Sequence, residues 1–168
     1  MKHNSKKMVY GALVGAMYVV LTLLAASFGM ANGLIQVRVS EALTILPLFT
    51  PSAIWGLFAG CIISNILTGC ALWDIVFGSL ATLIGAVITY YIGKVKLKNS
   101  YLIAPLGPIL SNTAIIPVIL TYVYGLTEAY YIICLGIFAG ELISAGLLGI
   151  LLYLGLKKHQ NVIFGKET

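Results

Sequence analysis

Long runs of apolar residues, separated by short polar stretches, make up almost the whole chain. Each run is long enough for a helix, and none shows the alternating pattern that is typical of a membrane β-strand. A helix satisfies its own backbone hydrogen bonds, so such runs are typical of bilayer-spanning segments. The pattern predicts an all-α integral membrane protein of six transmembrane helices in a single membrane domain, residues 1–168. The helices are expected at about residues 8–29, 39–52, 53–69, 74–93, 101–124 and 130–156.

Prolines interrupt the second and fifth of these segments. Pro47 and Pro51 shorten the second, because proline lacks a backbone N–H and clashes with the preceding turn. Pro105, Pro108 and Pro117 make the fifth irregular and free backbone carbonyls. Broken helices at membrane depth are tolerated where they border a cavity or are buried in protein. The prolines therefore favour a site near these two segments.

Composition and charge refine this interpretation. Of the 168 residues, 60% are hydrophobic and 9% are charged, with a mean hydropathy of +1.03, whereas soluble domains carry roughly a quarter charged residues. The net charge of +5 does not indicate nucleic-acid binding, because nine of the ten basic residues lie in the two tails and in the loop after the fourth segment. Six crossings that start inside place all three regions in the cytoplasm, as the positive-inside rule requires. Both termini are therefore expected to be cytoplasmic.

Two polar residues lie deep inside apolar segments. Glu141 lies in the sixth segment and Asn112 in the fifth. An acidic side chain at the centre of a spanning helix costs about 2.5–3.5 kcal/mol on insertion scales, so it marks a functional group facing the bundle interior. The alternative is a structural Glu that is hydrogen-bonded to neighbouring helices.

Further polar residues cluster near the predicted outer ends of the helices. Arg38, close to Gln36, is the one basic residue outside the three cytoplasmic regions. If the segment is helical, Arg38 and Glu41 share a face and either pair with each other or jointly contact a polar solute. Asn65 ends the third segment, and Trp73 with Asp74 opens the fourth.

For Trp73 and Asp74, a structural role is the alternative. An acid in a first helical turn is favoured by the helix dipole, and Trp73 fits the interfacial aromatic belt. Together, the polar residues indicate a pocket open to the outside that suits a planar solute rich in hydrogen-bond donors. A nucleobase-like compound with a cationic amine fits that description.

Signatures of enzymes and metal sites are missing from the sequence. It has no Gly-x-x-x-x-Gly-Lys-Ser/Thr loop, no His-Glu-x-x-His and no Gly-x-Ser-x-Gly. Cys61, Cys70 and Cys134 have no metal-site spacing and are expected to be packing residues. We therefore expect no catalytic residue, no metal and no cofactor.

Four segments resemble the QueT family, the substrate-binding S components of energy-coupling factor (ECF) transporters. They are residues 36–43 (QVRVSEAL) followed by Pro47, residues 74–83 (DIVFGSLATL), Gly107-Pro108 with Asn112, and Gly140-Glu141. The resemblance implies uptake, across the plasma membrane, of a queuosine precursor such as 7-aminomethyl-7-deazaguanine. It also implies docking on a transmembrane scaffold subunit, EcfT, that carries two cytoplasmic ATPases.

The resemblance also implies roles for single residues. Glu141 or Glu41 accepts two N–H groups of the ring, Asn112 bonds the ring carbonyl, and the remaining acid takes the aminomethyl cation. Ala12 and Ala16, one step round from Gly11 and Gly15, match the scaffold-contacting motif of related S components. Two alternatives stay open: a self-sufficient carrier or channel, and a membrane enzyme with Glu141 and Asp74 as acid and base.

Overall fold

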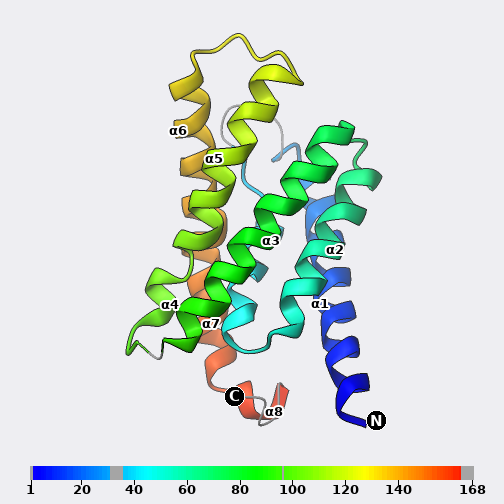
Figure 1. Cartoon of the computed structure of the whole chain (residues 1–168), viewed down its shortest axis with the longest axis vertical. Helices are drawn as coiled ribbons and strands as arrows, with labels where there is room; N and C mark the ends of the chain where they lie inside the picture. Colours follow the sequence, from blue (N-terminus) through cyan, green and yellow to red (C-terminus); the bar gives the residue numbers. More distant parts are fainter. Residues whose placement is uncertain (1, 31–35, 96, 164–168) are drawn as a thin grey trace.

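All regular elements in the described part of the chain are helical (Figure 1). The computed structural model describes residues 2–30, 36–95 and 97–163. The elements are α1 (Lys2–Ser27), η1 (Val39–Leu48), α2 (Ser52–Leu67), α3 (Leu72–Lys94), α4 (Ser100–Ile103), α5 (Leu106–Tyr122), α6 (Tyr130–Glu141), η2 (Leu142–Leu148), α7 (Gly149–Lys157) and α8 (Gln160–Ile163). The prediction of an all-α protein is confirmed over these residues.

Within the described residues, four helical stretches are long and apolar enough to cross a membrane. They are Ser5–Ser27, Leu72–Lys94, Ser100–Tyr122 and Tyr130–Lys157. The apolar helices η1 and α2 are shorter: the 16 residues of α2 extend over about 24 Å, against a hydrocarbon core of about 30 Å. The chain therefore has the character of a membrane protein, and the count of six crossings remains a prediction.

The second predicted helix is a 3₁₀-helix in the structure. η1 contains Pro47, ends at Leu48, and is followed by a turn before α2 begins at Ser52. Arg38 precedes η1 in an extended conformation, so it does not share a helical face with Glu41. The condition for the expected helical pairing of these two residues is therefore not met.

Other boundaries also differ from those expected. α1 begins at Lys2, before the apolar run, because helix geometry continues through the polar residues that precede it. The fifth predicted helix divides into α4 and α5 next to Pro105. The sixth contains a π-helical stretch, η2, which begins directly after Glu141. π-Helical turns inside α-helices frequently occur at functional sites.

Small residues let the helices approach closely. A Cβ atom on Gly56 of α2 would lie 3.0 Å from the carbonyl carbon of Gly11 on α1. A Cβ atom on Gly85 of α3 would lie 2.6 Å from the Cα of Pro108 on α5. Close backbone approach of this kind is how membrane helices pack without a hydrophobic driving force. The spacing of small residues in α1 and α2 therefore serves packing inside the bundle.

The two ends of the bundle differ in charge. Figure 1 shows the start of α1, the α3–α4 turn and the end of α7 at one end, which we call the lysine-rich end because Lys7, Lys94 and Lys157 lie there. The α2–α3 and α5–α6 connections lie at the opposite end. η1 packs inside the bundle against α1, α2, α3 and α7. A short, mostly buried element thus carries Glu41 into the interior.

Candidate functional site

A cavity of about 570 Å³ enters the bundle from the end opposite the lysines. Its volume lies within the range of small-molecule sites. We call it the main cavity. A smaller hollow shares the lining residues Gln36 and Arg38 with it, and we call this hollow the recess. The main cavity is lined by Tyr18, Thr22, Ala25, Ala26, Gln36, Arg38, Asn65, Thr68, Cys70, Asp74, Leu120, Tyr124 and Leu126. The recess is lined by Gln36, Arg38, Asn112, Ile116, Ile137 and Glu141.

Glu41 is fully buried and lines neither the main cavity nor the recess, but it is hydrogen-bonded to Tyr18, which lines the main cavity. The hydroxyl of Tyr18, on α1, donates a short hydrogen bond to Glu41 Oε1. Thr82, on α3, donates to the same oxygen at 3.1 Å. The other carboxyl oxygen has no hydrogen-bond partner among the described residues. Glu41 is therefore held in place through Oε1, and its carboxyl group lies near the side chain of Asn112 without a hydrogen bond of ordinary geometry between them.

Asn112 and Glu141 both line the recess, and Asn112 lies near the carboxyl groups of Glu141 and Glu41. Asn112 is 2% exposed and Glu141 is 5% exposed. Gly140 lets α6 lie against the backbone of Gln36, because a Cβ there would be 2.9 Å from the Gln36 carbonyl carbon. This close approach places residues 36–38 beside Glu141. The shape of the recess therefore depends on a glycine at position 140.

Arg38 is the cation of the site. Its guanidinium donates a 3.4 Å hydrogen bond to Gln36 Oε1. It also lies within electrostatic range of Asp74, Glu41 and Glu141. The site therefore sets three carboxyl groups against one guanidinium, and this excess of acid favours a cationic or donor-rich solute.

Asp74 is held at the wide end of the main cavity. The hydroxyl of Tyr124 donates to Asp74 Oδ2 at 3.2 Å and accepts the Ala71 N–H at 3.0 Å. The amide of Asn65 donates to the backbone carbonyl of Asp74 at 3.4 Å. Asp74 itself is only 5% exposed although it lies in the first turn of α3.

Six buried side-chain atoms have no hydrogen-bond partner within the described ranges. An unsatisfied buried polar atom costs about 1–3 kcal/mol, so each one calls for an explanation. Four of the six belong to residues that the sequence singled out. The atoms are Glu41 Oε2, Asp74 Oδ1, Asn112 Nδ2, Thr113 Oγ1, Glu141 Oε2 and Ser144 Oγ.

The structure brings most of the predicted binding residues together. Gln36, Arg38, Asn65 and Asp74 line the main cavity, Asn112 and Glu141 line the recess, and Glu41 lies in electrostatic range of Glu141. That these residues contact a solute remains a prediction.

Trp73 lies apart from this group. It is 56% exposed, stacks on Phe77 with a centroid distance of 5.8 Å, and is not among the cavity-lining residues. The aromatic side chains in the main cavity are instead Tyr18 and Tyr124. Sequence reasoning missed both, because a tyrosine inside or at the end of an apolar helix looks the same whether it faces lipid or a cavity.

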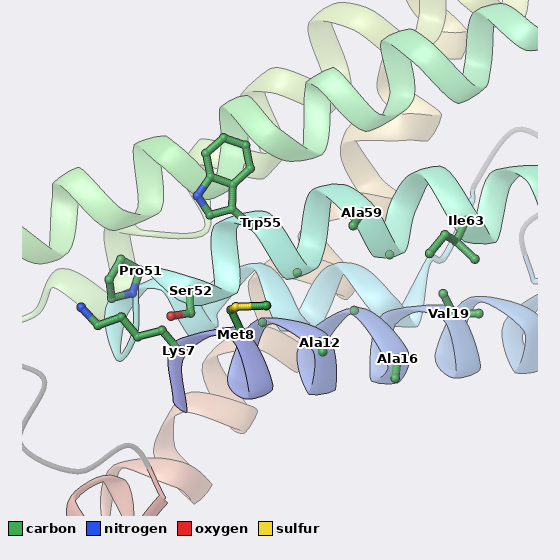
Figure 2. Close-up of a pocket in the computed structure, with 14 residues that line it drawn as sticks. Lys7, Met8, Ala12, Ala16, Val19, Pro51, Ser52, Trp55, Ala59 and Ile63 are labelled. Carbon is green, nitrogen blue, oxygen red and sulfur yellow. The ribbon is translucent and has the colours of Figure 1, made fainter. Parts of the chain in front are cut away.

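A second hollow, an apolar groove of about 790 Å³, runs between α1 and α2 (Figure 2). Ala12 and Ala16 of α1 line it, and Trp55 and Ile63 of α2 lie on its other side. Trp55 is 68% exposed. Both residues that were predicted to contact a partner therefore lie on one surface groove.

No set of three or more His, Cys, Asp or Glu side chains in the described ranges is arranged to hold a metal ion. The side chains around the site offer carboxyl oxygens that accept hydrogen bonds, and amide and guanidinium groups that donate them.

Comparison with known proteins gives two matches. The model of the family described as "QueT transporter" matches residues 8–158. The protein named "Queuosine precursor transporter QueT" of Lactococcus lactis subsp. cremoris (strain MG1363) is 37% identical over 84 residues, which cover 49% of this chain and 48% of that relative. The match thus spans about half the length of the relative. No solved structure matches.

Proposed function

Since this chain belongs to the QueT transporter family, we propose that it is the substrate-binding subunit, or S component, of an ECF-type importer for a queuosine precursor such as 7-aminomethyl-7-deazaguanine. The observation that carries this proposal is the group of buried, unpaired polar atoms around the main cavity and the recess. The name of the Lactococcus relative supports the choice of solute.

The unpaired atoms suit the edge of a deazaguanine ring. Glu141 Oε2 and Glu41 Oε2 accept N–H groups, and charge-assisted hydrogen bonds of this kind are the stronger ones. Asn112 Nδ2 donates to the ring carbonyl. Each of these atoms loses its desolvation penalty when the solute is bound, so binding is favoured over the empty state.

The charge distribution supports six crossings with both termini in the cytoplasm. The lysine-rich end then faces the cytoplasm, as the positive-inside rule requires, and the main cavity opens to the outside. The extended segment 36–38 and η1 together make the second crossing. Substrate sites of transporters are typically formed by discontinuous crossings of this kind. The whole chain acts as one domain in the plasma membrane.

The groove between α1 and α2 receives the partner. Ala12 and Ala16 lie against the transmembrane scaffold subunit, EcfT, and small residues there permit close helix approach. The scaffold carries two cytoplasmic ATPases, which supply the energy, since this sequence has no nucleotide-binding loop.

Calorimetric titration of the detergent-purified protein tests solute binding. We expect 7-aminomethyl-7-deazaguanine to bind more tightly than guanine. Glu141→Gln and Glu41→Gln should each weaken binding by about tenfold or more, because a hydrogen bond to a charged group is worth about 1.5–3 kcal/mol. Glu128→Gln makes the same change at an exposed loop acid and serves as the control. Unchanged affinity in both site variants would refute the site.

Reconstitution into liposomes tests the division of labour. With the scaffold and ATPases present, we expect uptake that depends on ATP. Ala16→Trp should abolish uptake and leave solute binding intact, since the groove and the cavity are separate. Uptake by this protein alone would support a self-sufficient carrier instead.

A further inference from the structure

We propose that Asp74, oriented by Tyr124, forms an ammonium subsite in the main cavity and selects solutes that carry a primary amine on the ring substituent. This inference rests on the proposed function, and it commits to Asp74 among the three acids of the site. It also adds Tyr124 as a positioning residue.

The surroundings of Asp74 are those of a binding group rather than of a helix cap. The start of α3 has no side-chain cap hydrogen bond, and Asp74 is 95% buried. Asp74 lines the main cavity, Tyr124 fixes its Oδ2, and its buried Oδ1 has no hydrogen-bond partner among the described residues. A buried carboxylate without a cation is costly, so this atom is suited to an ammonium group.

The other two acids are placed less well for this role. Glu41 is fully buried, and one of its oxygens already accepts hydrogen bonds from Tyr18 and Thr82. Glu141 lines the narrow recess, which leaves little space for a substituent. Asp74 lies in the wide main cavity, where a ring substituent has space.

Arg38 does not form the hydrogen bond that would occupy the Asp74 carboxyl group. Its guanidinium interacts electrostatically with Asp74, but its hydrogen bond goes to Gln36. Arg38 also lies within range of Glu41 and Glu141, so one positive charge is shared among three carboxyl groups. A second positive charge on the solute balances the site further.

The connection between main cavity and recess explains how one solute reaches both. Gln36 and Arg38 line both spaces, so the two meet at these side chains. The recess measures only about 10 Å³, so a flat ring lies in the main cavity with one edge turned toward Asn112 and Glu141 past Gln36 and Arg38. A substituent on the opposite side of the ring then points toward Asp74. Asn112 and Glu141 then recognise the ring, and Asp74 recognises the positive charge of the substituent.

A matched pair of solutes tests this subsite: 7-aminomethyl-7-deazaguanine is cationic, and 7-cyano-7-deazaguanine has the same ring without the charge. By calorimetric titration, the wild-type protein should bind the amine more tightly. Asp74→Asn should lower affinity for the amine by about 10- to 100-fold and change affinity for the nitrile by less than about twofold. Tyr124→Phe should cause a smaller loss confined to the amine, and Glu128→Gln should keep the wild-type ratio.

The outcomes separate this inference from the proposed function. The subsite would be refuted if Asp74→Asn kept the wild-type ratio of amine affinity to nitrile affinity, or lost affinity equally for both solutes. The transporter proposal would still stand. Equal wild-type affinity for the two solutes would likewise refute only the subsite. If the wild-type protein bound neither solute, both proposals would fall. Binding of the nitrile by Asp74→Asn also shows that this variant is folded. If the variant does not fold, Asp74→Glu replaces it, and we expect Asp74→Glu to lower affinity for the amine alone.

Discussion

Gly140→Ala is expected to weaken solute binding without unfolding the protein. A Cβ at residue 140 would lie 2.9 Å from the Gln36 carbonyl carbon and 3.3 Å from its amide nitrogen. Ordinary van der Waals contact begins at 3.4 Å, and the Gln36 carbonyl oxygen would lie closer still than the carbon, so the Gln36 backbone must move by well over 0.5 Å. These atoms belong to backbone, which cannot swing aside as a flexible side chain does.

The segment that would be displaced, residues 36–38, contributes two side chains to the lining of the site. Gln36 and Arg38 line both the main cavity and the recess, so their polar groups move away from the solute together. Loss of about 1–2 kcal/mol of hydrogen-bond energy corresponds to about a 5- to 30-fold rise in Kd. Calorimetric titration with 7-aminomethyl-7-deazaguanine measures this change directly.

Gly155→Ala is the matched control. It makes the same substitution in α7, where a Cβ would meet nothing within 4 Å. Both variants gain similar helix propensity, about 1 kcal/mol, so that effect cancels in the comparison. Equal Kd values for Gly140→Ala, Gly155→Ala and the wild type would refute the reasoning that the close approach of α6 holds segment 36–38 in its binding position.

Two further predictions concern residues that hold the site and the surrounding helices in position. Thr82→Val removes a donor at 3.1 Å from Glu41, and we expect a loss of about 1 kcal/mol, or a fivefold rise in Kd for the solute. Thr89→Val, which removes a bond to a backbone carbonyl away from the cavity, should leave Kd unchanged, and an equal effect of the two would contradict the prediction. Gly85→Ala places a Cβ 2.6 Å from the Cα of Pro108, so we expect about 1–3 kcal/mol of overpacking and a lower thermal midpoint in detergent. An unchanged midpoint would show that α3 and α5 can separate freely.

Much of the helix pattern follows from the sequence, because apolar runs in a membrane protein have few alternatives to helix. The six predicted segments correspond to helical segments in the structure, with shifted ends. Where the prediction differs, proline is nearby: η1 is 3₁₀ around Pro47, and α4 and α5 separate next to Pro105. Proline shows that regular geometry must break, but not which irregular geometry replaces it.

Candidate residues are more readily chosen from the sequence than their contacts are. Glu141 and Asn112 stand out because polar groups are costly at membrane depth, and the structure places both in the recess. Trp73 and Tyr124 could not be ranked in this way. Both are aromatic residues near helix ends, and only the packing of the helices turns Trp73 outward and Tyr124 toward Asp74.

The order of residues alone is enough to predict a helical chain that is suited to a membrane and carries a few polar groups at membrane depth. Hydrophobicity and the cost of burying charge act on each residue separately, so they can be assessed along the chain. That Tyr124 is hydrogen-bonded to Asp74, and that the backbone of Gln36 lies against Gly140, becomes visible only in the folded protein. These contacts join residues 50 and 104 positions apart, and their geometry depends on how the helices pack against one another.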